Sequence, residues 1–593
     1  MTPYGSLRTH GAGTVRPGDD GTEVTVAGWV ARRRDHGGVV FLDLRDRSGV
    51  VQVVADPTAS AALEAAHRVR GEYVVRVTGR VRTRPEGMVN PALETGEVEI
   101  AATALEILAE SETPPFPLDD DNPAEENLRL RYRYLDLRRP AVARAIRLRG
   151  DVTRVIRRVM EAHGFLDVET PILTRSTPEG ARDFLVPARL QPGNVYALPQ
   201  SPQLFKQLLM VAGLERYYQI ARCFRDEDLR ADRQPEFTQL DVEASFIDEE
   251  DLFSLMEELM TALWSELLGV DLAAPFPRIT FAESMARYGT DAPDTRFGME
   301  LVDLAGVFAG TEVGIFKGAL EAGGSVLAVR LPGGGQLTRR EFDEWVEFAK
   351  RRGAKGMAWV VYEKGTPRGP LAKFFTLDEI NELVEATGLE DGDALFFGAG
   401  ETRVTQELMG AVRVALARDR DLVPADRWDF VWVTRWPLLQ WHPDAQRWDA
   451  MHHPFTAPDD ASLATLEDAP GEAMSRAYDL ALNGSELGGG SIRIHRRDVQ
   501  QRVFALLGID AAEADEKFGF LLDALSYGAP PHGGIAFGLD RIAMLMAGAG
   551  SLRDVIAFPK TQTGGDPMTD APTAADPALL ADLGLRLLPP RKQ

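Results

Sequence analysis

The chain has 593 residues, a formal net charge of −24 and one cysteine, Cys223. This length exceeds what a single hydrophobic core organises, so we expect several domains, and one cysteine excludes intramolecular disulfides and cysteine-based zinc sites. The sequence has no run of 18 apolar residues and no apolar leader, which predicts a cytoplasmic protein without a membrane span. The acidic total argues against a polyanionic partner, but residues 128–158 hold eleven arginines and two aspartates, which favours one local nucleic-acid interface.

Short alternating strands dominate residues 1–108, with one helical piece at 59–70. Five such strands predict an OB-fold barrel, a fold that binds single-stranded nucleic acid on aromatic platforms. Phe41 either stacks on a base or fills the barrel core, and the adjoining arginines favour stacking. Residues 109–145 are first rich in proline and then in arginine, which predicts a hinge that touches nucleic-acid phosphate.

A second domain begins with a helical apolar stripe at 146–163, which Gly164 can cap. The strand predicted at 165–173 contains Pro171, and a proline belongs at a sheet edge or an interface. We assign residues 146–293 to this domain.

Residues 216–247 predict two strands joined by a long charged loop. The core face of the second strand holds Leu240, Val242, Ala244 and Phe246. The opposite face of the pair presents a row of polar and aromatic side chains: Arg225, Phe237, Gln239, Asp241 and Glu243. The alternative is an ordinary antiparallel pair with one solvated face.

Residues 294–424 predict an inserted α+β domain, with helices at 338–352 and 377–387, and they carry no catalytic constellation. Residues 425–562 return to the interrupted domain, and 563–593 predict a tail extended over the surface.

Three features of residues 425–562 indicate a ligand site. His452 and His453 could suggest a metal, but no third ligand has suitable spacing, so substrate contact is favoured. Asp479 and Glu486 can both reach one hard cation. Arg541 stands in the first turn of an apolar helix, where the helix dipole disfavours a cation, so a functional reason for it is expected.

Three segments resemble the signature motifs of class II aminoacyl-tRNA synthetases. The sequence from Phe224 to Glu227 resembles motif 2, the helix, strand and Pro171 resemble motif 1, and HGGIAFGLDRIAMLMAG (532–548) resembles motif 3. The wording around motif 2 is similar to the bacterial aspartyl branch. The resemblance implies a multidomain α+β protein: an anticodon-binding barrel, an antiparallel catalytic sheet and a GAD-type insertion at 294–424. It also implies a homodimer that uses ATP, Mg²⁺, L-aspartate and tRNA.

The resemblance also implies residue roles. Arg225 and Arg541 become the catalytic residues, and Lys206 with Arg493 clamps the substrate side-chain carboxylate. The full aspartate set is Glu179, Gln203, Lys206, Arg225, Asp241, His452 and Arg493. The full ATP set is Arg225, Glu227, Gln234, Phe237, Glu486, Gly538, Leu539, Asp540 and Arg541. Asp479 and Glu486 hold Mg²⁺.

On the barrel, the resemblance implies that Phe41, Gln52 and Glu99 bind the anticodon. His36 and Gly87 resemble the non-discriminating subtype, which charges both tRNA-Asp and tRNA-Asn; the alternative is an enzyme restricted to tRNA-Asp. Asparaginyl and lysyl enzymes are disfavoured by the insertion, and lysine also by the paired cations. A non-catalytic paralogue and an unrelated single-strand binder are disfavoured by the intact motifs.

Overall fold

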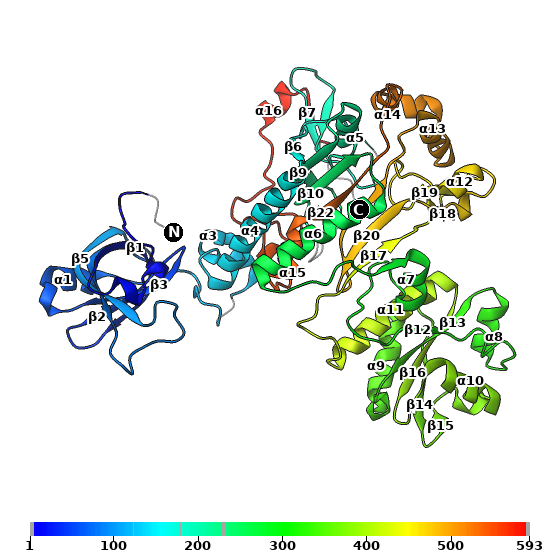
Figure 1. The fold of residues 1–593 in the computed structure, drawn as a ribbon, viewed down its shortest axis with the longest axis horizontal. Coiled ribbons are helices and arrows are strands. Elements are labelled where there is room, and N and C mark those ends of the chain that lie inside the picture. Colours follow the sequence, from blue (N-terminus) through cyan, green and yellow to red (C-terminus); the bar gives the residue numbers. More distant parts are fainter. Residues whose placement is uncertain (1–4, 122–123, 178–179, 228–232, 589–593) are drawn as a thin grey trace. The chain divides into compact units, whose positions relative to one another are not determined.

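The computed structural model describes residues 5–121, 124–177, 180–227 and 233–588 (Figure 1). It divides into two compact units, Met1–Arg129 with Tyr134–Arg139, and Leu130–Arg133 with Pro140–Gln593. The finer domain limits expected from the sequence, at 108, 145, 293, 424 and 562, remain predictions.

The first unit contains the predicted five-stranded closed barrel, with strand order β1-β2-β3-β5-β4. Alternate valines and leucines of each strand point inward and are fully buried, which is the pattern a filled barrel needs. The helix α1, which follows β3 and precedes β4 in the chain, packs against the barrel mainly at β5. The bounds are β1 (Glu23–Asp35), β2 (Val40–Asp46), β3 (Gly49–Ala55), α1 (Ser60–Arg68), β4 (Val74–Thr83) and β5 (Val98–Ala109).

The arginine-rich connection forms two short helices, α2 (Glu126–Arg131) and α3 (Arg133–Asp136). Arg133 is 2% exposed and donates to the carbonyls of Arg553, Ile556 and Ala557. Arg139 is 7% exposed and donates to the Asp119 carbonyl. The prediction that this stretch touches nucleic-acid phosphate is therefore wrong for these two arginines, because the fold itself uses their donors.

An eight-stranded sheet organises the second unit, with strand order β11-β17-β20-β21-β22-β10-β9-β6. Its pairs are antiparallel except at the two edges, where β6 runs parallel to β9 and β11 parallel to β17. The bounds are β6 (Leu166–Asp167), β9 (Arg216–Phe224), β10 (Glu236–Ser245), β11 (Arg278–Thr280), β17 (Phe430–Thr434), β20 (Ala477–Leu482), β21 (Ser485–Ile492) and β22 (His532–Gly538).

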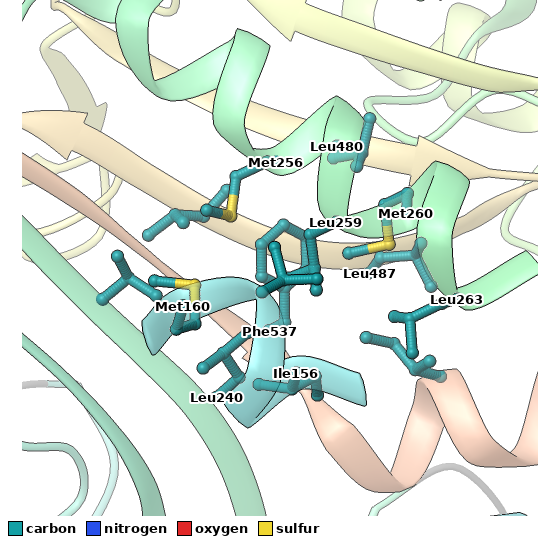
Figure 2. Close-up of a cluster of buried hydrophobic side chains, with 14 of the residues drawn as sticks. Ile156, Met160, Leu240, Met256, Leu259, Met260, Leu263, Leu480, Leu487 and Phe537 are labelled. Atoms are coloured by element: carbon teal, nitrogen blue, oxygen red, sulfur yellow. The ribbon is translucent and has the colours of Figure 1, made fainter. Parts of the chain in front are cut away.

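Helices α4 (Pro140–Ala162), α6 (Glu249–Leu268) and α15 (Leu539–Met546) cover one face of this sheet. Figure 2 shows the core between them, where Ile156 and Met160 of α4 meet Met260 of α6 and the strand residues Leu240 and Phe537. The opposite face of the same strands carries buried polar side chains, so the hydrophobic face fixes which residues line the site.

Two details of this domain differ from the sequence predictions. The strand expected at 165–173 is only the two-residue edge strand β6, since the chain leaves the sheet before Pro171. Phe246 is 68% exposed with φ +61°, because β10 ends at Ser245 and the next amide donates to the carbonyl of Pro531. Its predicted place in the core is wrong.

The insertion forms a separate five-stranded sheet, with order β12-β13-β16-β14-β15 and an apolar core on each face. Both predicted helices are confirmed as α9 and α10, while α8 and α11 were not expected. The bounds are β12 (Leu301–Asp303), α8 (Gly314–Glu321), β13 (Ser325–Leu331), α9 (Arg339–Lys350), β14 (Ala358–Glu363), β15 (Thr366–Arg368), α10 (Leu377–Thr387), β16 (Ala394–Gly400) and α11 (Thr402–Asp419).

Smaller elements surround the large sheet. They are β7 (Leu185–Pro187), β8 (Val195–Ala197), α5 (Gln203–Val211), α7 (Phe281–Tyr288), β18 (Leu439–His442), β19 (Arg447–Ala450), α12 (Asp460–Ala464), α13 (Arg497–Leu506), α14 (Ala511–Leu525) and α16 (Pro577–Asp582). The last of these interrupts the tail that was expected to be extended. None of the helices in the described ranges is both long and apolar enough to cross a bilayer.

Candidate active site

Two adjoining cavities open on the polar face of the large sheet. The first, of about 450 Å³, is lined by charged groups that include Lys206, Arg225 and Arg493, and we call it the charged cavity. The second, of about 250 Å³, is lined by Phe237 and Arg541, and we call it the Phe237 cavity. Both cavities share a set of lining residues: Arg225, Glu227, Gln239, Glu486 and Ala536. Two ligands placed in them would therefore meet at Arg225.

Four buried charges form one cluster at the charged cavity, which three of them, Lys206, Asp241 and Arg493, line. Lys206 Nζ lies 2.7 Å from Asp241 Oδ1 and 3.1 Å from Glu243 Oε2. Arg493 Nε lies 3.0 Å from Glu243 Oε1. All four residues are at most 2% exposed. Residue 534, opposite Glu243 on β22, is glycine because a Cβ there would lie 1.9 Å from the Glu243 carboxylate.

The two carboxylates of this cluster differ in protonation tendency. Burial alone would raise the pKa of Glu243, but the charges of Arg493 and Lys206 outweigh burial and lower this pKa. Burial raises the pKa of Asp241 despite the attraction of Lys206, and its Oδ2 has no hydrogen-bond partner. Glu243 is thus the fixed counter-ion of the cluster. The sequence placed it on this face but gave it no role; its alternation with buried Val242 was the available signal.

Of the two adjacent histidines, His453 contacts Arg493. Its Nε2 lies in hydrogen-bond contact with Arg493 Nη1, and burial and Arg493 hold its pKa well below the ordinary value. His452 lies against Trp436, and its Nε2 has no partner. Burial and Arg493 lower the pKa of His452 to about 4, so both rings are neutral at pH 7. Ligand contact was predicted for His452 alone, whereas both histidines line the charged cavity.

Asp479 and Glu486 converge across β20 and β21. Between them lies Gly489, where a Cβ would be 2.4 Å from Asp479 Oδ1 and 3.6 Å from Glu486 Oε1. Asp479 Oδ1 is buried and has no hydrogen-bond partner among the residues that the structure describes. Burial, followed by Glu486 and Asp291, raises the pKa of Asp479 well above its ordinary value. An unpaired buried carboxylate beside a second one suits a hard cation.

Within the described ranges, no three His, Cys, Asp or Glu side chains lie close enough to hold a metal by themselves. A cation here would therefore take its remaining ligands from water or from a bound anion, which is how Mg²⁺ binds with nucleotides.

The Phe237 cavity combines an aromatic ring with two arginines. The Arg225 guanidinium carbon lies 5.0 Å from the centroid of the Phe237 ring, and the Arg225 amide donates to the Pro235 carbonyl. Arg541 Nη1 donates to the Glu486 carbonyl at 2.5 Å. A flat ring with cations beside it suits a planar base that carries phosphates.

Several residues predicted to bind ATP have structural partners. The Gln234 amide group exchanges two hydrogen bonds with the backbone of Lys560. Asp540 accepts from the Thr238 amide at 2.8 Å and from Arg149 at 2.9 Å. Both still border the Phe237 cavity, whereas the Leu539 side chain lies in the hydrophobic core. An ATP contact by Leu539 would therefore come from its backbone, and it stays a prediction.

The remaining predicted site residues have the following positions. Gln203 is 7% exposed, lines the charged cavity and leaves its Nε2 unpartnered. Glu227 lines both cavities and pairs with Arg233 at 3.0 Å, and Gly538 borders the Phe237 cavity. Glu179 lies outside the described residues. Gly180, next to it in the chain, lines the charged cavity.

On the barrel, the predicted anticodon residues form one polar network. Gln52 Nε2 donates to Glu99 at 2.7 Å, Arg34 donates to Gln52 at 3.2 Å, and Arg82 donates to Glu99 at 2.7 Å. Phe41 is partly exposed between buried neighbours on β2, so it does not fill the barrel core.

The two residues expected to set tRNA choice are also on the barrel. The His36 ring lies edge-on to Phe41, with centroids 5.7 Å apart. Gly87 has φ +85° in the β4–β5 connection, where a Cβ would meet nothing within 4 Å.

This fold and this site define a class of protein. The family model described as tRNA synthetases class II (D, K and N) matches residues 125–562, and an OB-fold nucleic acid binding model matches 24–108. The chain belongs to this class II synthetase family.

The chain is also similar to particular curated relatives. It is 58% identical over 98% of its length to an Aspartate--tRNA(Asp/Asn) ligase of Acidothermus cellulolyticus, covering 97% of that protein. It is 56% identical, over 98% of its length, to one of Salinispora arenicola, covering 96% of it. Asparaginyl-tRNA synthetase of Pyrococcus horikoshii, solved with asparaginyl-adenylate, shares the fold at TM-score 0.57 and 20% identity, over 92% of this chain and 96% of that one.

Proposed function

We propose that this protein attaches L-aspartate to tRNA in two steps at the paired cavities, and that it charges both tRNA-Asp and tRNA-Asn. The observation that carries the proposal is the sharing of Arg225 by the charged cavity and the Phe237 cavity, with Lys206 and Arg493 lining only the first. The names of the relatives at 54–58% identity point to the same activity.

Aspartate enters the charged cavity. Its side-chain carboxylate takes over the Arg493 donor that now faces the neutral His453 ring, because a charge-assisted carboxylate bond is stronger than a bond to a neutral ring. It shares the ammonium of Lys206 with Asp241. Asparagine offers a neutral amide instead, which leaves buried cations poorly matched and is rejected. Glu243 accepts two hydrogen bonds from Arg493 and so holds this side chain in place when aspartate binds.

ATP enters the Phe237 cavity. Its adenine stacks on Phe237, with Arg541 on the other side of the ring, and its α-phosphate reaches Arg225. Asp479 and Glu486 would hold Mg²⁺, which supplies charge neutralisation along the phosphates when bound. Arg225 draws the two anions together and stabilises charge gained by the α-phosphate oxygens.

The first step moves no proton to a protein base. A carboxylate oxygen of aspartate bonds to the α-phosphorus, and the bond to pyrophosphate breaks. In the second step the terminal ribose hydroxyl of tRNA attacks the aspartyl carbonyl, its proton passes to a phosphate oxygen of the adenylate, and AMP leaves with the electron pair of the broken acyl–oxygen bond. Catalysis is therefore positioning and electrostatics.

The barrel selects the tRNA by stacking on Phe41 and bonding through Gln52 and Glu99. His36 beside Phe41, and the absence of a side chain at Gly87, leave the third anticodon base unselected, so tRNA-Asn is also accepted. The exposed Leu166, Ile172 and Leu173 at the β6 edge favour a homodimer there. An enzyme that uses tRNA and ATP works in the cytoplasm.

Aminoacylation of tRNA-Asp and tRNA-Asn transcripts side by side, with aspartate and with asparagine, tests the proposal. We expect aspartate to be attached to both transcripts at comparable rates and asparagine to neither. Charging of tRNA-Asn slower by orders of magnitude would show the discriminating enzyme instead. Activity with asparagine alone would refute the assignment.

A further inference from the structure

A carboxylate outside the predicted set, Asp291, lies at the active site. It lines the charged cavity together with Asp479 and Glu486, although it comes from the segment 289–299 between α7 and β12. Asp291 also lines a third cavity, of about 640 Å³. The Asp291 side chain is itself exposed, so its position depends on the support that the rest of its segment receives.

The insertion supplies that support through one arginine of α11. Arg413 is 0% exposed, its Nη2 donates to the carbonyls of Asp294, Phe297 and Gly298, each at 2.9 Å, and its Nε donates to Met299 at 3.0 Å. Its guanidinium also lies 4.1 Å from the Phe297 ring centroid. Burial lowers the pKa of Arg413 to about 10, so it remains charged at pH 7.

Two glycines bring α11 and the segment into backbone contact. A Cβ at Gly410 would lie 2.5 Å from the Tyr288 carbonyl oxygen, and one at Gly289 would lie 2.1 Å from that of Gln406. These neighbours are backbone atoms, so any larger residue at position 410 must push the segment away from the helix.

We infer that Asp291 is a third carboxylate acting on the cation at Asp479 and Glu486, and that the insertion holds it there through Arg413 and the Gly410 contact. The inference rests on the proposed function, because the cation arrives with ATP. Asp291 acts through water and its field, since no three ligands in the described chain converge directly. Mg²⁺ keeps several waters, which leaves room for such an outer partner. Asp479 is 8% exposed, and its Oδ1, which no described residue bonds, marks where the cation binds.

Asp291, Asp479 and Glu486 line the same cavity, so the three carboxylates face a common space. The insertion, in which no catalytic residue was predicted, would thereby contribute to cation binding. It would do so by holding the segment that carries Asp291.

Binding of Mn²⁺ tests the inference without catalysis. The dimeric full-length enzyme, saturated with a non-hydrolysable ATP analogue, is titrated with Mn²⁺, and free Mn²⁺ is read by its paramagnetic resonance signal. We expect Asp291→Asn to weaken Mn²⁺ binding about threefold to tenfold, as loss of one charge acting through water should. Asp444→Asn, an exposed aspartate at the β18–β19 turn, is the matched control and should bind as the wild type does.

Gly410→Ala tests the link to the insertion while keeping every charge. It should weaken Mn²⁺ binding in the same direction as Asp291→Asn, whereas Gly318→Ala in α8, where a Cβ meets nothing within 4 Å, should not. Should Gly410→Ala unfold, Arg413→Lys is the alternative variant. It keeps the positive charge but loses Nη2, the nitrogen that donates to the carbonyls of Asp294, Phe297 and Gly298, and it should weaken Mn²⁺ binding in the same way.

Wild-type Mn²⁺ affinity in Asp291→Asn would overturn the inference. Normal affinity in both folded Gly410→Ala and Arg413→Lys would overturn the role of the insertion. If the wild type lacks aspartate-dependent pyrophosphate exchange, the proposed function fails, and the Mn²⁺ comparison still decides this inference.

Discussion

The unpaired carboxylate of Asp479 predicts a trade between stability and activity. Its Oδ1 is buried, and within the described part of the chain it has no hydrogen-bond partner, so the ligand-free fold bears the cost of an uncompensated charge. Replacing it with asparagine removes that charge and keeps the shape. We expect Asp479→Asn to be more stable than the wild type and inactive in ATP–pyrophosphate exchange.

The size follows from the cost of burying an unsatisfied polar group, about 1–3 kcal/mol in protein mutants. For a cooperative domain of about 290 residues this corresponds to a rise in melting temperature of roughly 2–5 °C. Differential scanning calorimetry at pH 8, with Asp444→Asn as the exposed control, measures it.

The pH dependence has a definite sign. Burial, Glu486 and Asp291 raise the folded-state pKa of Asp479 above its unfolded value of 3.8. The wild type therefore loses stability as pH rises through the folded pKa, and recovers it on acidification. The advantage of Asp479→Asn should be largest at pH 8 and shrink towards pH 4. A variant melting at or below the wild-type temperature at pH 8 would refute the reasoning, as would an advantage that grows on acidification.

Three further predictions follow from the same geometry. Lys206→Met should abolish aspartate-dependent exchange and destabilise the fold by about 3–5 kcal/mol, because Asp241 and Glu243 lose a buried partner; calorimetry and exchange measure both. Arg225→Ala should abolish adenylate formation and leave the dimer mass unchanged in light scattering. Phe41→Ala should weaken tRNA binding by about 1–3 kcal/mol, as loss of one stacked base does, and leave exchange intact.

Each of these has an outcome that contradicts it. Near-normal exchange in Lys206→Met or Arg225→Ala removes the assigned role of that cation. A Phe41→Ala enzyme that loses pyrophosphate exchange together with tRNA binding would show a folding defect rather than a lost stacking platform.

The sequence predicted the barrel and the site strands well, because period-two alternation is a local signal. Leu240 and Val242 are buried in the core while Asp241 faces the cavity, as alternation required. The cavity shared by Lys206 and Arg493, 287 positions apart in the chain, was expected only from the family resemblance.

What the sequence missed depended on tertiary partners. Gln234 and Asp540, whose predicted ATP contacts stay predictions, also bind the distant partners Lys560 and Arg149, and no local pattern indicated these bonds. Arg133 belongs to the stretch predicted to touch phosphate, but three backbone carbonyls accept its donors. Asp291 carried no motif at all. Its position depends on Arg413, which lies on helix α11 more than 100 residues further along the chain. No local sequence pattern indicates such a contact.

We propose that Arg225 and Arg493 both contact one aspartate molecule, which binds beside ATP. A crystal structure of the enzyme with a stable aspartyl-adenylate analogue tests it most directly. The account predicts the side-chain carboxylate within hydrogen-bond distance of Arg493 and Lys206, and the phosphate against Arg225. An analogue bound with its carboxylate away from both cations, or with its adenine outside the Phe237 cavity, would contradict it.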